Sequence, residues 1–301
     1  PPYSNRTSAT LHMGTATVKM GDQAVDWQAL RESSLSAYRS QPILISLEGV
    51  EEMAVMAGTT PEATPLPPPL AGFFTRLNSE LAKVADKEIM VYVHGTKVDF
   101  TNAAVLAAEV EHFAGRDFVS VAYAWPSHQN ILSYLFGIDV QRARESSTPL
   151  VELLVLLAVH SDAEKIHLLS YSAGGRVTSK ALVEMRQRFT HLEAAQLKEQ
   201  FRLGSVIFAA ADVELDVFLE RLKAASDFAD QPPLPITGRR FQRRPGGAAR
   251  PRNGRLSADP REATRRLRVP LDAQTKSASC CKRDPAAARG NKRCLRTGPA
   301  G

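Results

Sequence analysis

The stretch that decides the fold is Ile-His-Leu-Leu-Ser-Tyr-Ser-Ala-Gly-Gly, residues 166–175. An apolar run typical of a buried strand leads into a turn of small residues, and a helical pattern follows. Such a turn suits a serine nucleophile, because a sharp bend from strand to helix lifts the hydroxyl above the edge of the sheet. The residues two before and two after Ser172 are Ser170 and Gly174, so the first position departs from the usual glycine but stays small. We predict Ser172 as a nucleophile. A glycine-rich strand-to-helix turn without chemistry is the alternative.

The chemistry also needs N–H donors for an oxyanion. A helix N-terminus offers unpaired ones, so the amide of Ala173 is one expected donor. An earlier apolar strand, residues 89–93, ends in His94-Gly95-Thr96. Gly95 allows close approach of the backbone. In folds that place a serine nucleophile at such a strand-to-helix turn, a loop after an earlier strand supplies the other half of the oxyanion hole.

Strand and helix patterns alternate through the first 230 residues. The segment 89–93 is apolar on both faces, as strands of a parallel sheet covered by helices are. We therefore predict an α/β fold, with a mostly parallel sheet between two helical layers. We expect Thr101 and Thr148 to cap helices. The predicted strands are 11–20, 42–47, 89–93, 118–125, 165–169 and 203–210; the predicted helices are 73–84, 101–114, 150–159 and 175–188.

The segment 231–301 differs from the rest in charge and pattern. It has 18 Lys and Arg against 4 Asp and Glu, whereas residues 1–230 have 20 basic and 28 acidic side chains. With one aromatic residue, Phe241, and repeated Pro, Gly and Arg, it cannot bury enough apolar area to order itself. We predict a folded domain over 1–230 and a disordered basic tail over 231–301. Translation in another reading frame would also give this abrupt change, and the fold would then lack its C-terminal strand and helix.

Several function classes are disfavoured. The apolar stretch at 150–159 is too short to span a bilayer. The tail lacks interleaved aromatic residues, which disfavours nucleic-acid binding. The cysteines, Cys280, Cys281 and Cys294, do not have zinc-site spacing. We expect no metal and no cofactor. The chain begins at Pro1 without Met, so its start indicates neither export nor retention in the cytoplasm.

Four motifs occur in this order along the chain: residues 91–96, Tyr123-Ala124-Trp125-Pro126-Ser127, residues 166–175, and residues 207–212 with 216–218. Together they resemble a bacterial family of α/β hydrolases of unknown function, the DUF900 type, which is esterase- or lipase-like. The resemblance covers about residues 1–230. It implies Ser172 as nucleophile, Thr96 and Ala173 amides as oxyanion donors, and Tyr171 and Gly175 as parts of the elbow.

The fold implied by the resemblance supplies an acid and then a histidine after the serine. Asp212 is the candidate acid, with capping of the next helix as the alternative. Of the seven histidines only His191 follows Ser172, about one helix away, and none occurs in 192–301. We predict a serine hydrolase of esterase or lipase type acting on an acyl ester and impaired by the missing base. The alternative is a catalytically silent protein that binds a hydrophobic ligand or a partner. We expect His94 to pack the loop, His167 to face a helix and Asp216 to lie on a helix surface.

Overall fold

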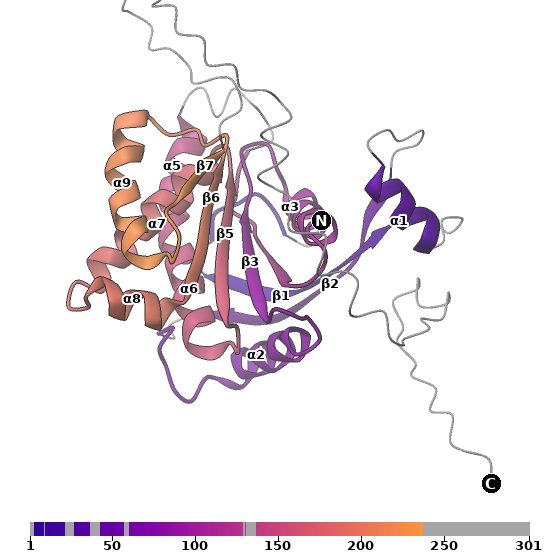
Figure 1. Ribbon diagram of the computed structural model, residues 1–301, viewed down its shortest axis with the longest axis horizontal. Helices are drawn as coiled ribbons and strands as arrows, with labels where there is room; N and C mark the ends of the chain where they lie inside the picture. The colour runs from indigo at the N-terminus through magenta and orange to yellow at the C-terminus, as the bar shows by residue number, and fades with distance from the viewer. Residues whose placement is uncertain are drawn as a thin grey trace, which may run out of the picture. The chain divides into compact units, whose positions relative to one another are not determined.

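A five-stranded parallel sheet forms the centre of the computed structural model (Figure 1). Its order is β4-β3-β5-β6-β7, and every neighbouring pair is parallel. The structure describes residues 3–8, 10–21, 27–36, 43–56, 60–128, 130 and 137–236. The strands are β3 (Glu88–Val93), β4 (Val119–Tyr123), β5 (Lys165–Tyr171), β6 (Leu203–Ala209) and β7 (Leu234–Ile236).

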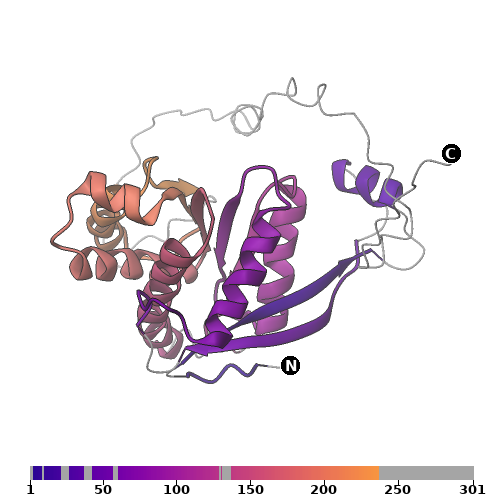
Figure 2. The ribbon, with the colours of Figure 1, turned by 90° about the horizontal axis from the view of Figure 1, so that it is seen from below.

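Helices cover both faces of this sheet. Connections between parallel strands are right-handed, so the direction of each connection decides which face its helix covers. The connection from β3 to β4 runs toward one edge of the sheet and places α3 on one face. The later connections run toward the opposite edge and place α6, α7 and α9 on the other face. Figure 2 shows α3 and the later helices on opposite sides of the strands. The predicted three-layer α/β architecture is confirmed. These helices are α3 (Phe100–Phe113), α5 (Ile138–Glu145), α6 (Ser147–His160), α7 (Gly174–Arg188), α8 (Ala194–Phe201) and α9 (Leu215–Phe228).

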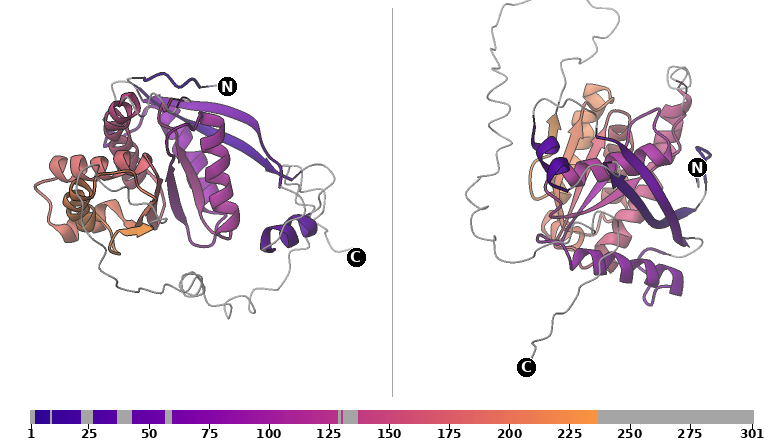
Figure 3. Two further views of the ribbon diagram at one scale, coloured as in Figure 1. Left: turned by 90° about the horizontal axis from the view of Figure 1, so that it is seen from above. Right: turned by 90° about the vertical axis from the view of Figure 1, so that its right-hand side faces the viewer.

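The N-terminal part of the chain adds a separate hairpin. The antiparallel strands β1 (Leu11–Met20) and β2 (Ile45–Met56) form a two-stranded sheet that packs on α3 and on α2 (Pro68–Leu81), as Figure 3 shows. The short helix α1 (Trp27–Leu35) belongs to a second structural unit.

The core lies where the central strands meet the helices. Ile89, Val91 and Val93 of β3 and Ile166 and Leu168 of β5 are fully buried, as the two-faced apolar pattern predicted. The predicted core helix at 150–159 is the buried body of α6.

Several local predictions are wrong. Asp99, not Thr101, caps α3: its carboxylate accepts the Asn102 amide at 2.8 Å. Thr148 lies inside α6, because α5 runs into α6 with only Ser146 between them, and its hydroxyl donates to Glu184. Helix α2 begins at Pro68 rather than at residue 73, since proline fits the first helical turn.

The sheet continues past the boundary predicted at residue 230. Strand β7 pairs with β6 at Ile207↔Leu234, Phe208↔Pro235 and Ala209↔Ile236. The prediction of a disordered tail is wrong for these three residues, because an edge strand tolerates a proline that lacks an N–H. Phe241 and the three cysteines lie outside the described residues.

Candidate active site

The turn at Ser172 has the strained geometry that a nucleophile elbow requires. Ser172 has a φ of +51°, a left-handed conformation that costs a non-glycine residue about 1–2 kcal/mol. Three backbone hydrogen bonds hold it: its amide donates to the Ala209 carbonyl at 2.9 Å, and its carbonyl accepts the amides of Gly175 at 2.9 Å and Asp212 at 3.0 Å. The neighbouring strand and loop therefore fix the conformation of the turn.

The glycines of the turn let it approach β3 and the loop after β6. A Cβ on Gly174 would lie 2.4 Å from the Val93 carbonyl oxygen and 2.6 Å from that of His94. A Cβ on Gly175 would lie 2.8 Å from the Ala211 Cβ. The small residue before the turn, Ser170, is fully buried, and its hydroxyl donates to the Ile207 carbonyl at 3.2 Å. Larger residues at these positions would push the elbow off the sheet.

The structure brings the loop after β3 against Ser172. Val93 pairs with Ser170 in the sheet, so the residues that follow the two strands are neighbours. A Cβ on Gly95 would lie 3.1 Å from both the Ser172 Cβ and the Tyr171 Cδ1. Between β3 and β5 the connections leave in opposite directions, and crevices open at such a switch point.

Two predicted oxyanion donors, Ala173 and Thr96, lie on these adjoining loops. No carbonyl among the described residues accepts the Ala173 amide. Tyr171 is about half exposed, with its ring beside Gly95.

His94 packs the loop. Its ring is 1% exposed and stacks on Trp125 at 5.3 Å, and its Nδ1 donates to the Gly95 carbonyl at 2.7 Å. The indole of Trp125 in turn donates to the His94 carbonyl at 2.7 Å. Burial lowers the pKa of His94 to about 4, so the ring is neutral at physiological pH.

Two side chains that follow β4 in the sequence, Asp139 and Ser127, hold the loop after β3 in place. Neither side chain was identified from the sequence as part of the site. The buried Asp139 carboxylate accepts the Thr96 hydroxyl at 2.8 Å and the His128 amide at 3.0 Å. The Ser127 hydroxyl donates to the Val98 carbonyl at 2.8 Å and accepts the Val98 amide at 3.2 Å. The Trp-Pro-Ser motif was the available signal for Ser127, whereas nothing in the local pattern indicated Asp139.

Asp212 follows β6 and lies beside the elbow. Its amide binds the Ser172 carbonyl, and its carboxylate pairs with Arg176 at 3.5 Å. Burial raises the pKa of Asp212. The alternative role as a helix cap is wrong, because Glu214 is the residue that precedes α9. Asp216 is exposed on the first turn of α9, as expected.

Residues 71–237, more than half of the chain, match the family described as an alpha/beta hydrolase of unknown function, DUF900. The chain belongs to this family. No curated protein matches it. Among solved structures it is similar to a Trichoderma reesei cutinase in complex with a C11Y4 phosphonate inhibitor, at 14% identity over 56% of this chain and 71% of that chain, with a TM-score of 0.28. A similarity of that extent bears on neither the activity nor the substrate of this α/β hydrolase.

No histidine hydrogen-bonds the Ser172 hydroxyl in the described part of the chain, which holds all seven histidines. The hydroxyl of Ser172 is partly accessible and makes no side-chain hydrogen bond there. The ring of His167, which was expected to face a helix, bridges Glu88 of β3 and the Ser205 amide of β6. The others are engaged elsewhere: His12 with Glu52, His94 with Trp125, His112 with Arg116, His128 with Asp139 through its amide, His160 with the Pro61 carbonyl, and His191 with Phe189.

The described residues contain no group of three or more His, Cys, Asp or Glu side chains that could hold a metal ion. Every helix among these residues falls short of the length and hydrophobicity that a membrane span needs.

Proposed function

We propose that this chain is a serine hydrolase of the esterase or lipase type, with Ser172 as its nucleophile. The observation that carries the proposal is the left-handed φ of +51° at Ser172 between β5 and α7. Strained conformations of this kind persist where the surrounding structure over-determines them, and they cluster at active sites. The accessible hydroxyl and the adjacent Gly95 loop support the same assignment.

In the proposed reaction, Ser172 Oγ attacks the carbonyl carbon of an acyl ester. The amides of Ala173 and Thr96 stabilise the oxyanion, and Gly95 leaves room for it. The C–O bond to the alcohol then breaks, and the alcohol departs with the serine proton. Water attacks the acyl-serine, releases the acid and restores the hydroxyl. Asp212 is the proposed acidic residue of the catalytic triad. Its carboxylate pairs with Arg176 and not with a histidine.

The missing base sets the expected rate. A serine hydroxyl is a weak nucleophile until a base accepts its proton. Loss of that base from a serine triad lowers turnover by about 10⁴–10⁶-fold, with residual catalysis from the oxyanion hole. We therefore expect this chain to hydrolyse acyl esters slowly.

The second candidate function is a catalytically silent protein that binds a hydrophobic ligand or partner. It is favoured by the Ser172 hydroxyl, which contacts no histidine in the described residues. Covalent labelling distinguishes a reactive Ser172 from an unreactive binding site.

The test is labelling with a fluorophosphonate probe, read by mass spectrometry of the modified peptide. We expect slow modification of Ser172, complete loss in Ser172→Ala, and unchanged labelling in the control Ser226→Ala, which removes an exposed serine of α9. Absence of labelling in the folded protein would support the silent site. Labelling that persists in Ser172→Ala would show that another residue reacts and would refute the assignment.

A further inference from the structure

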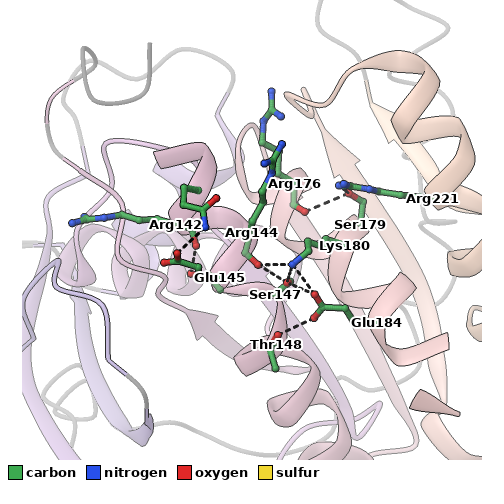
Figure 4. Close-up of polar contacts among 12 residues, drawn as sticks. Arg142, Arg144, Glu145, Ser147, Thr148, Arg176, Ser179, Lys180, Glu184 and Arg221 are labelled. Atoms are coloured by element: carbon green, nitrogen blue, oxygen red, sulfur yellow. Dashed lines mark hydrogen bonds and ion pairs between the residues drawn. The ribbon is translucent and has the colours of Figure 1, made fainter. Parts of the chain in front are cut away.

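Three arginines from three helices line one small cavity. Arg144 comes from α5, Arg176 from α7 and Arg221 from α9, and Figure 4 shows them with their polar contacts. The cavity measures about 130 Å³, room for a few water molecules or one small anion. Its remaining lining residues are Val213, Glu214 and Val217.

The guanidinium groups are poorly neutralised by the described residues. Arg176 has one long ion pair, at 3.5 Å to Asp212, and its buried Nε has no hydrogen-bond partner. Arg221 donates to the neutral hydroxyl of Ser179 at 3.2 Å and has no ion pair within 4 Å there. The Arg144 guanidinium makes neither an ion pair nor a hydrogen bond in the same part of the chain.

One nearby carboxylate, that of Glu184, is engaged by other partners. Glu184 of α7 pairs with Lys180 at 2.7 Å and accepts the hydroxyls of Ser147 at 2.9 Å and Thr148 at 3.1 Å (Figure 4). Lys180 also donates to the Arg144 carbonyl at 2.9 Å, which ties the end of α5 to α7. The network therefore positions the Arg144 backbone and leaves its guanidinium uncompensated.

The cavity keeps an excess of positive charge. Glu214 is its one lining carboxylate, against three guanidinium groups. Burial, with the charges of Arg144 and Arg176, lowers the pKa of Arg221, and Glu220 and Glu184 offset only part of this effect. Burial also lowers the pKa of Arg176, and Glu214 offsets only part of that effect. Like charges held this close repel one another, and a bound anion would relieve the repulsion.

We propose that this cavity binds the phosphate group of a small soluble ligand. Arginine suits the task, because its planar fork of N–H donors matches phosphate oxygens and stays charged at all physiological pH values. A dianion balances the excess charge better than a single carboxylate does. The site goes beyond the proposed hydrolase activity and does not depend on Ser172.

The probe for the test is inorganic phosphate, added to the full chain at constant ionic strength with sodium chloride or sodium acetate as comparisons. Isothermal titration calorimetry and thermal melting report binding. We expect phosphate to bind and to raise the melting temperature more than acetate does. Arg144→Gln and Arg221→Gln should each weaken binding about tenfold or more, the size of one charge-assisted hydrogen bond.

Two control variants separate the site from general charge and from catalysis. Arg76→Gln removes the same charge from an exposed ion pair on α2 and should leave binding unchanged. Ser172→Ala should also bind phosphate normally, whatever the outcome of labelling. Far-UV circular dichroism checks folding, and Arg144 is exposed enough for its variant to fold.

Three results would overturn the proposal. The first is no phosphate effect beyond that of chloride. The second is acetate binding as strong as phosphate binding. The third is phosphate binding that survives both Arg144→Gln and Arg221→Gln, which would place the anion elsewhere, for example on the basic segment after residue 236.

Discussion

Gly174 determines how closely the elbow can approach the end of β3. The space beside its Cα is filled by the carbonyl oxygens of Val93 and His94. These are backbone atoms of a central strand and its loop, so they cannot rotate away as a flexible side chain would. The position of the Ser172 hydroxyl therefore depends on residue 174 being a glycine, which has no Cβ.

We predict that Gly174→Ala destabilises the protein by about 3 kcal/mol and abolishes fluorophosphonate labelling, because the added Cβ must displace the elbow. Urea unfolding measures the stability. The control is Gly72→Ala in α2, where nothing lies within 4 Å of an added Cβ; it should gain about 0.5–1 kcal/mol from helix propensity. Equal effects of the two substitutions would contradict the packing argument.

The sequence indicated the parts of the candidate site that depend on local geometry. The small residues around Ser172 and the glycine after an apolar strand are short patterns with a direct steric reason. The contact between the two loops also followed, because parallel strands end at one edge of the sheet. The Thr96–Asp139 hydrogen bond could not be predicted, since it joins residues 43 apart through a segment without a clear period.

At the scale of elements, helices and strands with a strong apolar pattern were predicted within a few residues. Strands β3, β5 and β6 and helices α3, α6 and α7 are of this kind. Short polar helices were missed, namely α1, α5 and α8, because eight or nine residues hold too few apolar positions to show a period. Strand β7 was missed because its pairing with β6, and not its own Leu-Pro-Ile sequence, defines it.

The N-terminus of α3 gives a test of which residue caps a helix. The Asp99 carboxylate accepts the Asn102 amide at 2.8 Å, whereas Thr101 lies within the first turn. We predict that Asp99→Ala costs about 1 kcal/mol of unfolding free energy, both from the lost hydrogen bond and from the lost negative charge at the positive end of the helix.

The matched control is Thr101→Ala, which should change stability by less than about 0.5 kcal/mol. Urea unfolding of both variants beside the unmodified protein measures the difference. A larger loss from Thr101→Ala than from Asp99→Ala would restore the cap first expected from the sequence.

At the scale of the whole molecule, the two halves of the sheet meet around a buried histidine. His94 follows β3, stacks on Trp125 after β4, and has its Nε2 buried without a partner in the described residues. Its carbonyl also lies against Gly174 of the elbow. Charge on this ring would therefore destabilise the loops of β3, β4 and β5 together, and with them the global fold.

We predict that protonation of His94 contributes to the loss of folding stability at low pH. Its pKa is about 4 in the folded protein, because of burial, against about 6.5 in the unfolded chain, so the unfolded state binds more protons between these values. The stability that neutral His94 contributes is complete above pH 6.5 and is lost as the pH falls toward 4, a change of about 3 kcal/mol.

Urea unfolding from pH 7 to 4.5 should show this decline. The decline should be markedly smaller in His94→Gln, although that variant is less stable at neutral pH. His191→Gln, which alters an exposed ring, should decline as the unmodified protein does. An equally steep decline in His94→Gln would mean that the carboxylates, and not this histidine, govern acid unfolding.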